Sequence, residues 1–189
     1  MIRNVKEVTD LKFGGKAYGL NKLNKLNVTV PEAYAIDQVS INEIIADDKE
    51  ALAQLKLILN EFDTNATFAI RSSAANEDGK EKSFAGMYDT ILNVPNNLST
   101  IVEAIKKVNN SLESERLNSY NETKSKMNIV LQLMILPKIA GVCFTNAIDL
   151  NGQDVIYIEY VEGIGESLVS GKKTAKSVVV SLNDYSYRC

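Results

Sequence analysis

The stretch from Ala69 to Asp78 reads Ala-Ile-Arg-Ser-Ser-Ala-Ala-Asn-Glu-Asp. The residues Thr67 to Ile70 predict a short strand that ends at Arg71. An arginine at the end of a strand presents a planar fork to phosphate oxygens, and the two serines after it, Ser72 and Ser73, add hydroxyl donors. The stretch is therefore a candidate anion site.

Three other segments are small and flexible enough to approach a ligand. Gly14-Gly15-Lys16 combines two glycines with a lysine at a predicted helix start, where free N–H groups favour an anion. Ser83 to Thr90 surrounds one glycine with small and hydroxyl side chains, which suits a loop over phosphates. Gly163-Ile164-Gly165-Glu166-Ser167 follows a predicted strand and places an acidic side chain in a tight turn.

Each segment also has a purely structural interpretation. Arg71 fits an ion pair with Glu77 or Asp78, Lys16 fits a surface position after a turn, and Ser83 to Thr90 fits a simple hairpin connection. The Gly-x-Gly turn lacks the third glycine of a dinucleotide fingerprint. Taken singly, the segments leave these alternatives open.

The composition excludes several kinds of chemistry. The 189 residues contain no histidine, so the chain has no imidazole base, histidine metal ligand or phosphohistidine of its own. A net charge of −3 argues against a nucleic-acid or anionic-membrane binder. No signal peptide and no long apolar run is visible, which predicts a cytoplasmic protein without a membrane segment.

The hydrophobic periodicity predicts an α+β fold with two lobes in one domain, residues 1–189. The first lobe is helix-rich, with a helix from Lys16 carrying Leu20, Leu23 and Leu26 as its apolar stripe. Ser-x-x-Glu at Ser40 predicts the capping box of one long helix or of two short ones, and Thr-x-x-Glu at Thr100 predicts that of a further helix. A β-rich second lobe with a mixed or antiparallel sheet follows a polar boundary at about 110–127; its predicted strands are 128–135, 139–145, 154–161 and 176–182.

In their order along the chain and in their residues, these segments resemble the nucleotide-binding domain of the phosphoenolpyruvate synthase, pyruvate phosphate dikinase and rifampin phosphotransferase family. The matching stretches are Gly14 to Leu20, Val30-Pro31, Ala69 to Asp78, Ser83 to Val94, Val130 to Met134, Ala140 to Thr145 and Gly163 to Gly171. The resemblance implies an ATP-grasp-like fold that clamps ATP between two lobes. It also implies phosphoryl transfer to a histidine on a separate swivelling domain, in the same protein or in trans.

The resemblance implies a role for each matching position. Lys16 and Arg71 would be the catalytic residues that hold the ATP phosphates. The other implied contacts to the cofactor ATP, with Mg²⁺, are Gly15, Ser72, Ser83, Gly86, Thr90, Gln132, Met134 and Glu166. Among these, Gln132 and Met134 would line the adenine pocket, and Glu166 would face the phosphate and metal end.

The family's metal-binding carboxylates and its end signature lie beyond the position of Cys189, so the metal ligands stay unknown. No phosphohistidine domain is expected in this chain. We therefore expect a fragment of a dikinase-type phosphotransferase that is inactive alone, with a reduced homologue as the other possibility. The alternative function is a non-catalytic regulatory or interaction module that keeps the fold. The acceptor substrate is not implied by these residues.

Overall fold

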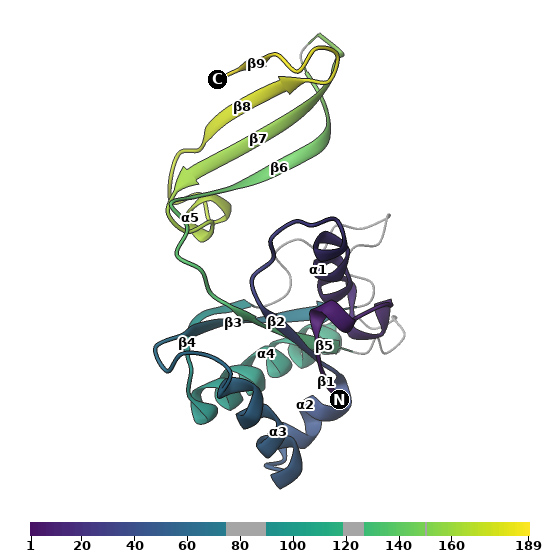
Figure 1. Cartoon of the computed structure of the whole chain (residues 1–189), viewed down its shortest axis with the longest axis vertical. Helices are drawn as coiled ribbons and strands as arrows, with labels where there is room; N and C mark the ends of the chain where they lie inside the picture. The colour runs from purple at the N-terminus through teal and green to yellow at the C-terminus, as the bar shows by residue number, and fades with distance from the viewer. Residues whose placement is uncertain (75–89, 119–126, 150) are drawn as a thin grey trace. The chain divides into compact units, whose positions relative to one another are not determined.

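The computed structural model describes residues 1–74, 90–118, 127–149 and 151–189, and the chain divides into two compact units (Figure 1). Unit 1 is Met1–Met134 and unit 2 is Ile135–Cys189. The predicted lobe boundary at about 110–127 falls inside unit 1: residues 110–118 continue a helix, and 119–126 lie outside the described residues.

Unit 1 is built on a five-stranded sheet with the strand order β1-β2-β5-β3-β4. Every neighbouring pair in it is antiparallel. Its strands are β1 Ile2–Asn4, β2 Ala33–Ile36, β3 Thr67–Ala74, β4 Thr90–Pro95 and β5 Met127–Leu133. The predicted place of the β5 segment in the second lobe is wrong, because β5 lies between β2 and β3 in the sheet of unit 1. Its residues Ile129, Val130 and Leu131 are all buried, as expected of a central strand that is covered on both faces.

Helices cover the two faces of this sheet unequally (Figure 1). On one side, called here the helix face, lie α2 Gln38–Ile45, α3 Lys49–Leu59 and α4 Leu98–Asn118. On the other side, the α1 face, lie α1 Gly15–Lys25 and the short turns η1 Val5–Glu7 and η2 Leu11–Phe13. The main hydrophobic core fills the helix face, and a smaller cluster lies under α1.

The helices of the helix face begin earlier than their predicted capping boxes. Asp37 caps α2 by accepting from the Ser40 amide at 3.0 Å, so Ser40 lies inside the helix and is buried. Likewise Asn97 accepts from the amide of Ser99 at 3.0 Å, ahead of Thr100. Both corrections have one cause: an Asp or Asn three residues upstream is an equally good acceptor for the first amides of the helix.

The α1 helix is confirmed, but its predicted apolar stripe is wrong. Leu23 and Leu26 are 43% and 72% exposed, and only Leu20 packs against the small cluster. The helix instead buries Ala17 and Asn21. Asn21 lies within reach of backbone acceptors, and its Nδ2 donates to the carbonyls of Val5 at 3.1 Å and Lys6 at 2.7 Å. The small side chain of Ala17 lets α1 lie close to the sheet, and the two bonds from the Asn21 Nδ2 tie the helix to η1, while the buried Asn21 Oδ1 has no partner.

Unit 2 is a four-stranded sheet in the order β6-β7-β8-β9, and of the two predicted arrangements, mixed or antiparallel, it has the antiparallel one. Its elements are β6 Ile139–Ile148, β7 Asp154–Glu162, α5 Glu166–Val169, β8 Lys176–Ser181 and β9 Tyr187–Arg188. The α+β class is thus confirmed, with strands in both units. No helix within the described ranges combines the length and the apolarity that a membrane crossing requires.

Candidate functional site: a polar row beside the Gly-Gly-Lys turn

Strand alternation divides the side chains of β3 between the two faces of the sheet. Phe68 and Ile70 belong to the main core on the helix face, whereas Arg71 and Ser73 point to the α1 face. Ser72 lies between them in sequence and therefore points to the helix face, where it is fully buried. The structure thus brings Arg71 and Ser73 together and separates them from Ser72.

Arg71 is the centre of a polar row across three strands. Its Nη1 donates to Oε1 of Gln132 on β5 at 2.9 Å. On the other side its Cα pairs directly with Thr90 of β4, and directly paired residues share a face. Gln132 is buried and Thr90 is exposed, so the row runs from the interior of the sheet to its edge strand.

Burial lowers the pKa of the Arg71 guanidinium from its ordinary value, because desolvation disfavours the charged form. An arginine nevertheless keeps its proton in a protein. The bond to Gln132 uses one of its five N–H donors and holds the guanidinium plane in one orientation. A partly desolvated, oriented cation of this kind binds an anion more strongly than an exposed one does.

The Gly-Gly-Lys turn lies against the same face of the sheet. Gly14 has a φ of +88°, and a Cβ at this position would lie 2.2 Å from the carbonyl oxygen of Ser73. Only glycine therefore fits between the turn and β3. Gly15 and Lys16 follow as the first residues of α1, with Gly15 buried and Lys16 half-buried.

Two polar side chains join this turn to the sheet: Ser73, which the sequence suggests only as a donor to an anion, and Asn128, which no motif selects. The Ser73 hydroxyl donates to the Phe13 carbonyl at 2.9 Å and accepts from the Ala17 amide at 3.3 Å. Asn128 donates from Nδ2 to the Lys12 carbonyl at 3.1 Å. The sequence does carry one signal for Asn128: it is a polar residue inside the apolar run of β5, and a buried polar group needs a partner.

The remaining predicted residues are placed as follows. Met134 ends unit 1, is half-buried, and its amide donates to the Thr67 carbonyl at 2.8 Å. Glu166 belongs to unit 2, where its carboxylate lies 3.5 Å from Nζ of Lys172. Ser83 and Gly86 lie outside the described residues. Within the described ranges, no three acidic or cysteine side chains gather as a possible metal site.

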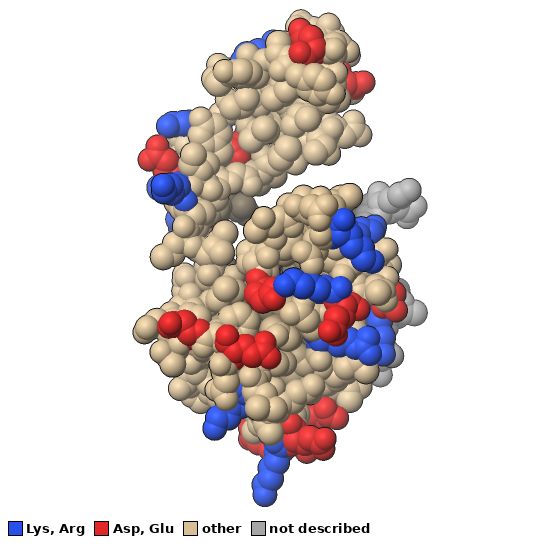
Figure 2. Space-filling view, viewed as in Figure 1, with Lys and Arg blue, Asp and Glu red and all other residues tan. Residues whose placement is uncertain are grey.

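The polar row is not surrounded by a broad region of positive surface charge. On the visible face of unit 1, acidic and basic side chains lie close to one another (Figure 2). The net charge of the whole chain is −3. The visible charge of unit 1 therefore forms no general positive field that would attract an anion.

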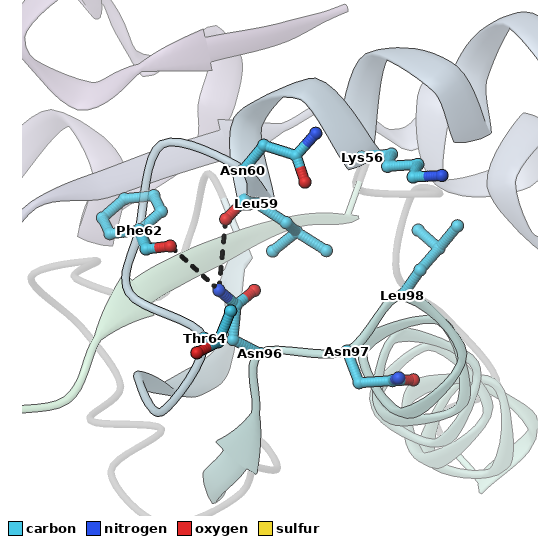
Figure 3. A pocket seen from close by; sticks show the side chains of 8 residues that line it. All are labelled: Lys56, Leu59, Asn60, Phe62, Thr64, Asn96, Asn97 and Leu98. Atoms are coloured by element: carbon cyan, nitrogen blue, oxygen red, sulfur yellow. Dashed lines mark hydrogen bonds between the residues drawn. The ribbon is translucent and has the colours of Figure 1, made fainter.

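A hollow of about 510 Å³ lies elsewhere on unit 1, where α3 ends and α4 begins (Figure 3). Asn96 lies at its base and donates to the carbonyls of Leu59 at 3.1 Å, Phe62 at 3.4 Å and Asp63 at 2.9 Å. This side chain ties the end of α3 to the strand before α4. None of the predicted site residues lines the hollow, so we treat it as a structural junction.

The chain belongs to the family described as pyruvate phosphate dikinase, AMP/ATP-binding domain, which it matches over residues 48–187. The match includes Arg71, Thr90, Gln132, Met134 and Glu166, and begins after Lys16. The resemblance inferred from the motifs is thereby confirmed, and the chain is an ATP/AMP-binding domain of the phosphoenolpyruvate synthase and dikinase type.

Its relatives include three named enzymes. It is 31% identical to the prodigiosin synthesizing transferase PigC of Serratia marcescens over 196 residues, covering 89% of this chain and 22% of that protein. It is 32% identical to a rifampicin phosphotransferase of Bacillus subtilis, covering 70% of this chain and 16% of that protein. It is 38% identical to a phosphoenolpyruvate synthase of Aeropyrum pernix, covering 61% of this chain and 15% of that protein. The chain therefore spans less than a quarter of the length of these relatives.

Proposed function

We propose that the chain binds ATP in an ATP-grasp-like arrangement and supplies a phosphoryl group from it to a histidine on another domain or another chain. The observation that carries the proposal is the common placement of two cationic segments. Arg71, held by Gln132, lies on the sheet face against which the Gly14-Gly15-Lys16 turn is packed. A cation from a strand and a cation at a helix start, on one face, form a suitable cradle for a polyphosphate.

In this proposal the side chains have separate tasks. Lys16 and Arg71 neutralise the phosphate oxygens, and their charge stabilises the transferring group as its bonds loosen. Gly15 lets the backbone come close to the phosphates, and Thr90 adds a hydroxyl at the edge of the row. Gln132 orients Arg71 and, with Met134, borders the adenine. Because Ser72 points to the other face, its hydroxyl is left out of the proposed contacts.

The proposal for Mg²⁺ rests on the family and on the chemistry of ATP. Mg²⁺ prefers carboxylates, water and substrate phosphates as ligands, and it supplies charge neutralisation on the phosphates. The described residues do not form a carboxylate cluster that fits it, and Glu166 is paired with Lys172. We therefore derive no step through the metal. Transfer also needs a histidine from elsewhere, because this chain has none.

Thermal unfolding with and without MgATP tests the nucleotide claim. Lys16→Ala and Arg71→Ala should each weaken ATP binding by about tenfold to a hundredfold, the range for a lost hydrogen bond to a charged group. Lys25→Ala on the same helix and Arg3→Ala on β1 are controls, because both side chains are exposed and away from the polar row. Equal stabilisation of all five proteins by MgATP, or of none, would refute the proposal.

The transfer step has its own test. Because we expect the chain to be inactive alone, it is incubated with a histidine-bearing domain of a relative and with ATP labelled on its β- and γ-phosphates. Acid-labile label on that histidine, lost with Lys16→Ala, is the expected result. Binding of ATP without any transfer would leave the binding part standing and refute the phosphotransferase part.

A further inference from the structure

The start of α1 is capped by a residue from a different part of the chain. Gly14 occupies the N-cap position and has no side chain with which to accept a bond. The Ser73 hydroxyl of β3 takes over this task, since it accepts from the amide of Ala17, the third residue of α1. The same hydroxyl donates to the carbonyl of Phe13, immediately before the turn.

Asn128 of β5 adds a second attachment to the segment that precedes the two glycines. Its Nδ2 donates to the Lys12 carbonyl at 3.1 Å and lies 3.5 Å from the Ser73 carbonyl oxygen, and the residue is 2% exposed. The chain is therefore held at Lys12 and Phe13 before the two glycines and at Ala17 after them. Lys16 lies inside this held segment.

We infer that Ser73, supported by Asn128, is a positioning residue for ATP binding: it sets Lys16 at a fixed distance from Arg71. The inference rests on the proposed function. Ser73 and Arg71 are neighbours on one face of one strand, so any phosphate chain that bridges Lys16 and Arg71 depends on the Ser73 attachment. Without this attachment a Gly-Gly turn samples many conformations, and ordering it would reduce affinity.

The adjacent serine provides a matched control. Ser72 and Ser73 are both fully buried, on the same strand, and differ in the face they occupy. The Ser72 hydroxyl has no hydrogen-bond partner in the structure. Ser72→Ala removes the same atom as Ser73→Ala without touching the turn, and loss of an unpartnered hydroxyl costs little.

Calorimetric titrations with MgATP and with adenosine test the inference. Ser73→Ala should lower ATP affinity about tenfold, the equivalent of one well-placed hydrogen bond, and change adenosine affinity less than about twofold. Asn128→Ala should show the same selectivity with a smaller loss, and Ser72→Ala should change neither. In a Lys16→Ala background, Ser73→Ala should cost less than about threefold more, because the two residues act as one unit.

The outcomes separate this inference from the proposed function. If the wild type fails to bind ATP, both are refuted. If Lys16→Ala and Arg71→Ala weaken binding but Ser73→Ala and Asn128→Ala do not, the proposed function stands and the positioning role is refuted. Equal losses for ATP and adenosine would show that Ser73 is merely structural, and a full additional loss in the Lys16→Ala background would also overturn the inference.

Discussion

The two faces of the five-stranded sheet in unit 1 differ in what they carry: an apolar core lies on one side, and the site that we propose for ATP lies on the other. On the helix face, β3 presents Phe68 and Ile70 to a continuous apolar core. On the α1 face the same strand presents Arg71 and Ser73 to a polar row and a glycine turn. Neighbouring positions of β3 therefore differ in their expected effect. A substitution on the helix face should change stability, and one on the α1 face should change binding.

The largest expected effect is on the helix face. Phe68 is 1% exposed and makes an edge-to-face contact with Phe62, with ring centroids 5.1 Å apart. Phe68→Ala should lower the free energy of unfolding by about 3–5 kcal/mol, since a large cavity replaces the ring. Urea unfolding measures this loss, and Phe68→Leu is the milder control. ATP affinity of the folded protein should stay within about twofold; a loss as large as that of Lys16→Ala would contradict the separation of the faces.

On the α1 face, Gly14→Ala should act on both stability and binding. The residue has a φ of +88°, and its new Cβ would lie 2.2 Å from the Ser73 carbonyl oxygen, which is backbone and cannot rotate away. We expect a loss of about 2 kcal/mol in unfolding free energy, from backbone strain and displacement of the turn. ATP affinity should fall with it, measured by titration below the unfolding temperature.

Gly19→Ala in the same helix is the matched control for Gly14→Ala. A Cβ at Gly19 meets no atom within 4 Å. Alanine in a helix interior is more favourable than glycine by about 1 kcal/mol, so this variant should be slightly more stable and bind ATP as the wild type does. Equal behaviour of the two alanine variants would show that the Gly14 turn is not packed against β3.

The strands of both units show what could and could not be predicted from the sequence. β7 and β8 were located within a residue or two, because alternating apolar residues between turns are a local signal. The insertion of β5 between β2 and β3 had no such signal, since strand order depends on contacts between distant segments. The same holds for the site: Lys16, Arg71 and Gln132 came from motifs, whereas the bond from Asn128 to Lys12 joins residues that no local pattern connects.

The smallest of these effects concerns α2, which helps to cover the helix face. Burial opposes the charged form of Asp37, but the Ser40 amide and the Met1 ammonium outweigh it and lower the pKa of the carboxyl from its ordinary value. Because the folded pKa is lower than the unfolded one, the stabilisation is present above the unfolded pKa, near pH 4, and is lost as the pH falls through the folded pKa.

Asp37→Ala should therefore cost about 1 kcal/mol at pH 7, the usual value for a lost N-cap, and progressively less below about pH 4. Asp37→Asn keeps an oxygen that accepts from the Ser40 amide but does not titrate. Its unfolding free energy should lie within about 0.5 kcal/mol of that of the wild type at pH 7. As the pH falls, this variant should not show the part of the loss of stability that comes from protonation of Asp37. Neither variant should change ATP affinity, because α2 lies on the face opposite to Arg71; a change in affinity would mean that the two faces are coupled.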